Sequence, residues 1–246
     1  MAGGRVTSGT LYLVGVGPGD PELLTLKAAR ILGAAAVVAY PATGEDSALA
    51  LEIARSHINP AAKRLPIAIP MTLERGPAQA AYDAGAAAML SHLREGRDVA
   101  YLCAGDPLFY GSAMYVLDRV APHAPVAVVP GVTSLTAAAA AIARPLAARN
   151  ETLKILPAPL PDETLRAELA QAPAVAIIKV GRHFDRIRAL LGETGHASSA
   201  IVVEHATTAR QRITRLADFG HHERPYFSTI LCYSGTETWG NRERGE

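Results

Sequence analysis

The sequence predicts an α/β protein of two domains, and three observations lead to this prediction. Short apolar runs alternate with helical patterns over the first half of the chain, which is typical of a parallel sheet with helices on both faces. The rhythm of these elements changes after residue 133, where a second set begins. The length of 246 residues leaves room for two hydrophobic cores. We therefore expect domains at residues 1–133 and 134–235, with a loose polar tail at 236–246.

The first domain is expected to contain at least four strands with helices between them. Asp20 is placed to cap a helix that has Pro21 in its first turn and Gly33 as its stop. The other elements are expected as strands at 11–16, 36–40, 99–103 and 126–129, and as helices at 46–57, 79–94 and 111–120.

The second domain begins with an alanine-rich helix at 135–142. A proline-rich turn follows the next apolar run, and a helix is expected to start at Asp162. The remaining elements are expected as strands at 153–156, 175–180, 200–204 and 227–233, and as a helix at 184–191.

Composition and charge argue against several classes of function. Lysine and arginine number 24 against 23 aspartates and glutamates, and neither half of the chain is strongly basic, which disfavours a nucleic-acid or anionic-membrane binder. The two cysteines, Cys103 and Cys232, lie in apolar runs, as in a reduced cytoplasmic protein. The N-terminus does not resemble a signal peptide, and the most apolar stretch, 137–143, is too short to span a membrane. A cytoplasmic location is expected.

A glycine-rich loop follows the first expected strand. Gly15, Gly17 and Gly19 resemble a dinucleotide-binding loop, in which glycines let a ligand approach the backbone at a helix N-terminus. The spacing differs from that motif, however, and Tyr40 and Pro41 stand where the ribose-binding acid is expected. Taken alone, this loop is better explained as a tight turn between a strand and a helix.

Two further loops of small residues follow strands of the first domain, at 103–111 and 130–134. Carboxyl ends of parallel strands meet at one sheet edge, where open α/β folds bind ligands. Gly105 and Gly111 permit close approach of the backbone, and Asp106 offers a carboxylate acceptor. Asp106 followed by a proline is also typical of a helix N-cap, and both roles are compatible.

The loops resemble, in order and spacing, those of the tetrapyrrole (uroporphyrinogen and precorrin) methylases, which use S-adenosylmethionine. The resemblance extends from about residue 9 to 234, through the segments 16–21, 104–111, 130–134, 178–182 and 204–211. It implies two α/β domains with the cofactor in the trough between them, and a homodimer. It is strongest to members that methylate the C-20 meso carbon of precorrin-2, a polycarboxylate tetrapyrrole of cobalamin biosynthesis.

The resemblance also implies which residues contact the cofactor. By position these are Pro18, Ala104, Gly105, Asp106, Phe109, Tyr110, Thr133, Ser134, Lys179, Val180, Ala206 and Thr207. Lys179 stands where the family has a methionine, so we expect its contact to be made through the backbone, because a buried cation beside a sulfonium is unfavourable.

The chemistry of this cofactor requires few catalytic groups. Its methyl group is already activated, so the protein mainly has to align the reacting atoms and allow one proton to leave. We expect no metal site and no catalytic triad. Tyr110 and Glu204 are the candidate catalytic residues for steadying charge near the reacting carbon.

A polycarboxylate substrate requires arginines, which bind carboxylates through two parallel hydrogen bonds. We expect two or three of the following set to serve: Arg144, Arg149, Arg182, Arg186, Arg188, Arg210, Arg212 and Arg215. Three alternatives stay open at this point: the same reaction on a cobalt-containing substrate, methylation of ribosomal RNA, and a nicotinamide-dependent oxidoreductase.

Overall fold

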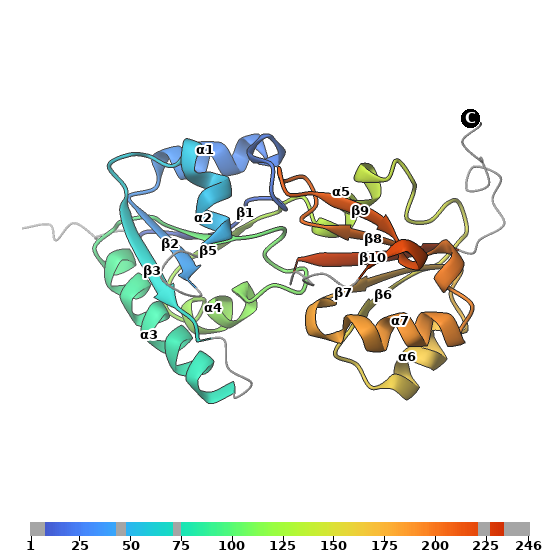
Figure 1. Cartoon of the computed structure of the whole chain (residues 1–246). Helices are drawn as coiled ribbons and strands as arrows, with labels where there is room; N and C mark the ends of the chain where they lie inside the picture. The colour runs from blue at the N-terminus through green and yellow to red at the C-terminus, as the bar shows by residue number, and fades with distance from the viewer. Residues whose placement is uncertain (1–7, 43–47, 71–74, 221–226, 234–246) are drawn as a thin grey trace, which may run out of the picture. The chain divides into compact units, whose positions relative to one another are not determined.

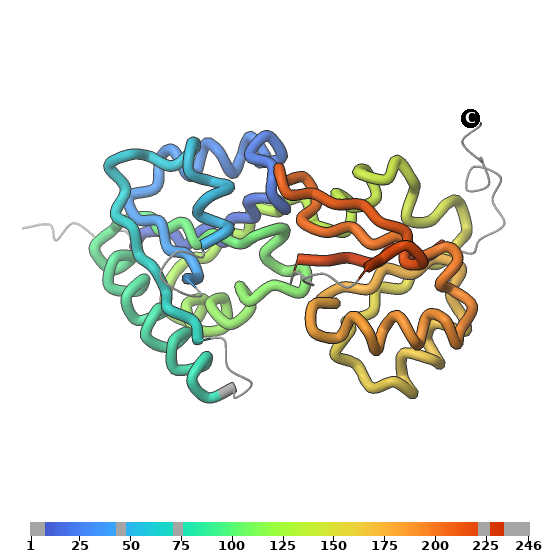
Figure 2. Tube along the Cα trace, viewed as in Figure 1, coloured from blue at the N-terminus to red at the C-terminus, as the bar shows by residue number. Residues whose placement is uncertain are grey.

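The computed structural model describes residues 8–42, 48–70, 75–220 and 227–233. The chain divides into two units, Met1–Thr133 and Ser134–Glu246. The trace from blue to green forms the first unit, and the trace from yellow-green to red forms the second (Figure 2). The polar tail expected at 236–246 lies outside the described residues.

The first unit contains a five-stranded sheet in the order β3-β2-β4-β1-β5, and every neighbouring pair is parallel (Figure 1). Its strands are β1 (Leu11–Gly15), β2 (Val37–Ala42), β3 (Lys63–Ala68), β4 (Val99–Cys103) and β5 (Val126–Val129). Its helices are α1 (Leu26–Ala34), α2 (Leu49–Ala54), α3 (Arg75–Arg94) and α4 (Ala113–Val120), with short 3-10 turns at Pro21–Leu23 and Arg55–His57. The predicted parallel sheet is confirmed.

Both faces of this sheet are buried, which explains its continuous apolar strands. Leu13 and Tyr101 pack against α3 and α4 on one face. Val14 and Leu102, their neighbours in sequence, pack against α1 and α2 on the other face. Successive strand residues point to opposite faces, so a strand covered by helices on both sides has no polar alternation.

The entry into α1 differs in detail from the expected helix. Asp20 caps only the short 3-10 turn Pro21–Leu23, and α1 begins after Thr25, whose hydroxyl oxygen accepts a hydrogen bond from a backbone N–H of the first turn. The prediction that Gly33 stops the helix is wrong, because Gly33 lies inside α1. The helix ends where Ala35 turns extended.

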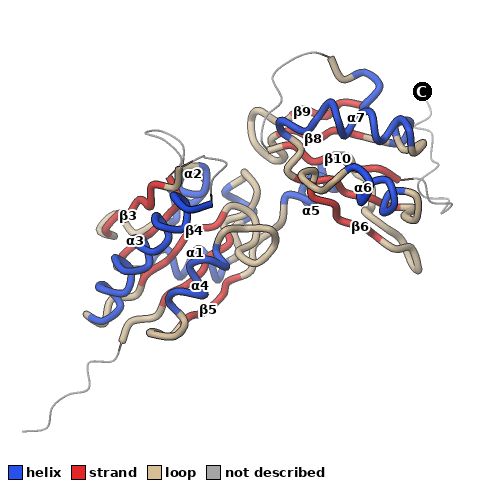
Figure 3. Tube along the Cα trace, turned by 90° about the horizontal axis from the view of Figure 1, so that it is seen from below, coloured by secondary structure: helices blue, strands red, loops and turns tan. Residues whose placement is uncertain are grey.

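The second unit contains a mixed sheet in the order β6-β7-β10-β8-β9. Its strands are β6 (Leu153–Pro157), β7 (Ala174–Ile178), β8 (Ile201–Glu204), β9 (Arg212–Arg215) and β10 (Ser228–Tyr233). Its helices are α5 (Ser134–Ala141), α6 (Asp162–Leu169) and α7 (Phe184–Glu193), with 3-10 turns at Gly181–His183, Ala197–Ser199 and Leu216–Asp218. Figure 3 shows strands of this sheet beside α6 and α7. β6 and β7 are parallel, and the other neighbouring pairs are antiparallel. The second α/β unit is confirmed.

The core of the second unit lies between its sheet and the pair α6 and α7. Leu165 and Ile187 of these helices share one buried cluster with Val175 and Ile230 of the sheet. Within the described part of the chain, no helix of either unit is long and apolar enough to cross a membrane.

Candidate functional site

Three loops of the first unit meet at the carboxyl edge of its sheet, because β1 lies between β4 and β5. The loops after β1 and β4 are joined directly by their backbones. Gly105 N donates to Gly17 O at 2.7 Å, and Gly17 N donates to Gly105 O at 3.3 Å. The sequence therefore placed these loops on one sheet edge correctly.

The glycines of these loops pack against one another's backbone. A Cβ added to Gly131 would lie 2.2 Å from Gly105 O, and one added to Gly15 would lie 2.6 Å from Gly131 N. Gly105 differs, since its added Cβ would be 4.0 Å from its nearest neighbour, Val132 O, although its φ of +72° is left-handed. Gly105 is therefore the glycine whose open side permits close approach of another molecule to the backbone.

Asp106 links the loops after β4 and β5. One carboxylate oxygen accepts from Leu108 N at 2.9 Å, and the other accepts from Gly131 N at 3.0 Å. The expected role of Asp106 as a helix N-cap is wrong, because turns follow it and α4 begins only after Ser112. Its carboxylate instead holds two loops together across 25 residues of sequence.

The other first-unit candidates lie on the same loops. Ala104 is exposed and Pro18 is half-buried. Phe109 and Tyr110 stack edge to face, with ring centroids 5.1 Å apart, and Tyr110 remains 45% exposed. Thr133 is the last residue of this unit, where it is half-buried.

Three loops of the second unit also share one sheet edge. β7 and β8 both run antiparallel to β10, and β6 runs parallel to β7, so the carboxyl ends of β6, β7 and β8 lie together at that edge. The loops after β7 and β8 carry Lys179, Val180, Ala206 and Thr207, and Ser134 is the exposed first residue of α5.

The loop after β7 begins with a left-handed residue. Lys179 has a φ of +58° and an exposed side chain, whereas Val180 is fully buried. The expectation that Lys179 contacts a ligand through its backbone stays a prediction. The left-handed turn also ends β7 at Ile178, two residues before the strand end predicted from sequence.

The loop after β8 is held by its own side chains. Gln211 Oε1 accepts from Thr207 N at 2.7 Å, and Thr208 Oγ1 donates to His205 O at 2.9 Å. Burial, followed by the nearby charge of Arg210, lowers the pKa of His205. Glu204 ends β8 and is 1% exposed, with Arg212 Nε 3.9 Å from its carboxylate.

Left-handed backbone is concentrated at the predicted site. Among the described non-glycine residues, those with positive φ are Tyr110, Ala143, Arg149, Lys179, His205 and Thr207. Three of these six are predicted cofactor residues, and a fourth adjoins Ala206. Such strain occurs preferentially at ligand-binding and active sites. Thr207 is the strongest case, because a β-branched residue rarely adopts a φ near its +67°.

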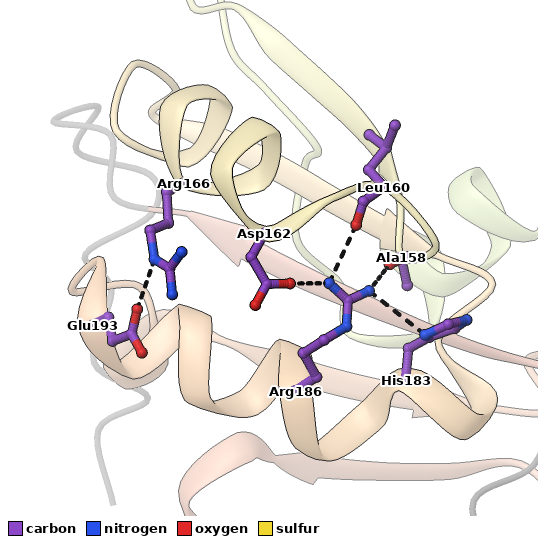
Figure 4. Close-up of polar contacts among 7 residues, drawn as sticks. All are labelled: Ala158, Leu160, Asp162, Arg166, His183, Arg186 and Glu193. Atoms are coloured by element: carbon purple, nitrogen blue, oxygen red, sulfur yellow. Dashed lines mark hydrogen bonds and ion pairs between the residues drawn. The ribbon is translucent and has the colours of Figure 1, made fainter.

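The structure assigns structural roles to three of the candidate arginines. Arg144 donates to Ser199 O and Leu231 O, and burial lowers the pKa of its guanidinium. Arg188 donates to Phe219 O at 3.0 Å. Arg186 contacts the chain's own acceptors between α6 and α7 (Figure 4). Their donors serve the fold, so Arg149, Arg182, Arg210, Arg212 and Arg215 remain as candidates for a ligand.

Sequence reasoning missed two features of this site. It did not identify Gly131 as the partner of Asp106, although a glycine directly after a strand and a proline is a usable signal. It also gave His183 no role, whereas the structure places this ring between Arg182 and Arg186. No local sequence pattern predicts that arrangement, because it depends on how the chain folds around α7.

A family model describes the chain from residue 10 to residue 218, and its description is Tetrapyrrole (Corrin/Porphyrin) Methylases. The chain belongs to this family. The resemblance inferred from the loop sequences is thereby confirmed for 209 consecutive positions, which include every candidate cofactor residue.

Three curated relatives are similar over most of the chain. The precorrin-2 C(20)-methyltransferase of Sinorhizobium sp is 38% identical over 91% of this chain and 94% of its own length. The cobalt-precorrin-2 C(20)-methyltransferase of Salmonella typhimurium is 32% identical over 91% and 96%. The cobalamin biosynthesis protein CobIJ of Mycobacterium tuberculosis is 40% identical over 92% of this chain, which spans only 46% of that longer protein.

Two solved structures share the fold and more than a quarter of the residues. A cobalt precorrin-4 methyltransferase has a TM-score of 0.75 and 26% identity, with 98% of this chain and 99% of that chain covered. The uroporphyrin-III C-methyltransferase of Thermus thermophilus, solved with S-adenosylhomocysteine, has a TM-score of 0.65 and 28% identity, with 92% of each chain covered.

Proposed function

We propose that this protein transfers a methyl group from S-adenosylmethionine to the C-20 meso carbon of precorrin-2, giving precorrin-3A in cobalamin biosynthesis. The observation that carries this proposal is the 38% identity, over almost the whole of both chains, to a precorrin-2 C(20)-methyltransferase. The local geometry supports it, because the loops expected to bind the cofactor are ordered by backbone contacts and contain left-handed residues.

S-adenosylmethionine fits the groups that these loops offer. Gly105 presents backbone with an open Cβ side, and Ala104 beside it is exposed. Lys179 has a left-handed backbone and is exposed as a residue. We propose that Pro18, the segment 104–106, Phe109, Tyr110, Thr133 and Ser134, together with Lys179, Val180, Ala206 and Thr207, contact the cofactor. Its sulfonium supplies an activated methyl group.

The chain's own residues then have to align the reaction. They would hold the C-20 carbon in line with the cofactor's methyl group and let the C-20 proton pass to solvent after the transfer. We propose that Tyr110, with its exposed ring, steadies charge on the macrocycle. Glu204 is buried, so we propose that the negative charge of its carboxylate stabilises positive charge on the substrate at a distance. Its ion pair with Arg212 would also order the loop that follows β8.

The test combines cofactor binding with product analysis. Calorimetry is expected to show binding of S-adenosylhomocysteine and no binding of NADH. Incubation of metal-free precorrin-2 with methyl-labelled S-adenosylmethionine is expected to give a product labelled at C-20 by NMR. Binding of NADH alone, or label at another carbon, would contradict the proposal.

A second candidate is the same reaction on cobalt-precorrin-2. The 32% identity to a cobalt-precorrin-2 C(20)-methyltransferase favours it, although the identity to the relative named precorrin-2 C(20)-methyltransferase is higher, at 38%. Parallel assays with the metal-free and the cobalt-loaded substrate separate the two. We expect the larger kcat/KM with the metal-free tetrapyrrole.

We also propose a homodimer in a reducing, cytoplasmic compartment. The thiols of Cys103 and Cys232 are both free and buried, and burial raises the pKa of each, that of Cys232 to about 12. Such thiols are inert and suited to a reduced protein. The low charged fraction of 19% is compatible with an additional buried interface. Sedimentation at micromolar concentration is expected to give a dimer, and a monomer would refute that part.

A further inference from the structure

Tyr82 of α3 is a buried tyrosine whose hydroxyl reaches the start of α4. The residue is 4% exposed and lies in the same apolar cluster as Ala113 of α4. Burial raises the pKa of its phenol, and a hydrogen bond with the side chain of Ser112 is the largest opposing cause. Ser112 directly precedes α4, a helix that the structure describes in full, yet its side chain makes no capping hydrogen bond there. The Ser112 hydroxyl therefore serves the contact with α3 rather than the start of its own helix.

Contacts between α3 and α4 hold the Tyr82 ring in place. The two helices cover the same face of the first sheet (Figure 1). The ring centroid of Tyr82 is 5.0 Å from that of Tyr115 and 5.9 Å from the guanidinium carbon of Arg119. Arg119, on α4, donates to Asp83 Oδ1 at 2.6 Å and to Gln79 Oε1 at 2.8 Å, both on α3. These contacts fix the position from which the Tyr82 hydroxyl meets Ser112.

Ser112 lies at the end of the loop that follows β4, and this loop carries Tyr110, a proposed cofactor contact. The beginning of the loop is fastened to the neighbouring loops by the backbone of Gly105 and the carboxylate of Asp106. Tyr110, two residues before Ser112, has a left-handed φ of +53°. Such a conformation persists only where its surroundings hold the chain on both sides. The hydrogen bond between Ser112 and Tyr82 fastens the chain on the far side of Tyr110.

We propose that Tyr82 is a positioning residue for S-adenosylmethionine: its hydroxyl holds Ser112 and thereby fixes Tyr110 in the conformation that contacts the cofactor. This inference rests on the proposed function for the identity of the ligand. Without the hydrogen bond, the end of the loop is free to leave the left-handed conformation, and binding then has to order it again, which lowers the affinity.

The first test is a calorimetric titration of the full chain and its variants with S-adenosylhomocysteine. Tyr82→Phe keeps the ring and removes only the hydroxyl, and we expect the Kd to rise about 3- to 10-fold. Ser112→Ala should have the same effect, because it removes the other partner of the same hydrogen bond. The double variant should bind at most about twofold more weakly than either single variant, since the two changes remove one interaction.

Tyr101→Phe is the matched control for the loss of a hydroxyl. Tyr101 lies on β4 in the same cluster and is fully buried. Its hydroxyl faces Ser112, but it has no hydrogen-bond partner of ordinary geometry among the described residues. This variant should keep the Kd within about twofold of the parent. Leu93→Val, a change of a fully buried residue near the far end of α3, controls for stability: it should lower the melting temperature and leave the Kd unchanged.

The second test is hydrogen exchange of the protein without added ligand, which reports on the loop directly. The backbone amides of residues 108–112 should exchange about 3- to 10-fold faster in Tyr82→Phe and in Ser112→Ala than in the parent. They should exchange at the parental rate in Tyr101→Phe.

The inference is overturned if Tyr82→Phe binds S-adenosylhomocysteine as tightly as the parent or weakens binding no more than Tyr101→Phe or Leu93→Val does. It is also overturned if the losses of the two single variants multiply in the double variant, or if exchange in the loop is unchanged. Failure of the proposed function gives a different pattern. The parent itself would then bind no S-adenosylhomocysteine, and the inference would fall with it even where the loop exchanged faster in the variants.

Discussion

In the first unit the loops after β1, β4 and β5 hold one another mainly through backbone atoms, whereas in the second unit side chains hold the loops after β6, β7 and β8. Gly17 and Gly105 exchange two backbone hydrogen bonds, and Gly131 packs on Gly105. In the second unit, Arg186 fastens the loops after β6 and β7, and Gln211 fastens the loop after β8.

The two units also differ in the residues that adopt left-handed backbone. Near its sheet edge the first unit uses Gly17 and Gly105, with Tyr110 as the one described exception. The second unit uses Lys179, His205 and Thr207 at the corresponding edge, beside Gly181. A glycine adopts this conformation without steric strain, but another residue requires about 1–2 kcal/mol from its surroundings. The first unit is therefore built for close packing, and the second unit stores strain.

The largest expected effect breaks the backbone packing of the first unit. In Gly131→Ala the new Cβ would lie 2.2 Å from Gly105 O and 2.9 Å from two backbone atoms of Gly15. Backbone atoms at the end of β1 and in a loop bonded to it cannot move without breaking other contacts, so we expect a loss of about 3 kcal/mol or more in the free energy of unfolding. Urea denaturation measures this loss.

The matched control is Gly33→Ala in α1 of the same unit, where the new Cβ would meet only His57 O at 3.9 Å. This variant should be as stable as the parent or more stable by about 0.5–1 kcal/mol, because alanine favours a helix interior. A Gly131→Ala variant as stable as this control would show that the loops are not close-packed.

The two strands that sequence missed both lie at sheet edges, although the edge strands β5 and β6 were predicted from their apolar runs. Interior strands such as β1 and β4 are covered on both faces and read as apolar runs. The missed strands β3 (Lys63–Ala68) and β9 (Arg212–Arg215) are edge strands, each paired on one side and largely exposed. Pro66 is tolerated in β3 because an edge strand needs fewer ladder hydrogen bonds. The charged residues in both strands and the proline in β3 interrupt the apolar run that would indicate a strand.

The site shows the same division. The glycine-rich loops of the first unit could be predicted from the sequence, because glycines directly after a strand indicate a tight turn or a close approach of backbone. The contacts of Arg186 could not be predicted from the sequence, since its acceptors Ala158 and Leu160 lie more than 25 residues away along the chain. Hydrogen bonds of this kind between a side chain and a distant loop depend on how β6, α6 and α7 pack in the folded unit.

Asp106 is a side chain that binds two loops of the first unit together, and its substitution gives the next largest expected effect. Asp106→Asn keeps one acceptor oxygen, so either Leu108 N or Gly131 N would face an amide NH₂ instead of a carboxylate oxygen. We expect a loss of about 1.5–3 kcal/mol in the free energy of unfolding. Asp118→Asn, an exposed aspartate of α4, should cost less than about 0.5 kcal/mol. If both variants lost the same free energy of unfolding, the hydrogen bonds of Asp106 would contribute no more to stability than an ordinary exposed aspartate.

The third prediction measures the strain in the second unit. Thr207→Gly should be more stable than Thr207→Ala by about 1 kcal/mol, because both remove the hydroxyl but only glycine relieves the φ of +67°. Gly105→Ala in the first unit is the reciprocal change and should lose about the same amount, since space for its Cβ is available and only its φ of +72° opposes it. If Thr207→Gly were no more stable than Thr207→Ala, the second unit would store no strain there.

The smallest expected effect is a dependence on pH that arises chiefly in the second unit. Burial is the largest cause that lowers the pKa of both His183 and His205, and nearby arginines add to it. The unfolded chain, with histidine pKa near ~6.5, then holds more protons than the folded protein just below that pH. The contribution of these histidines to stability is therefore complete above pH 6.5 and decreases as the pH falls toward the lowered pKa values.

We expect the melting temperature to fall between pH 7.5 and 5.5, before ordinary carboxylates titrate. The double variant His183→Gln, His205→Gln should remove roughly 1–2 °C of that fall. His92→Gln is the first-unit counterpart, since burial also lowers the pKa of His92, and as a single site it should remove less. A larger effect from His92→Gln would place the acid sensitivity in the first unit and reverse this part of the comparison.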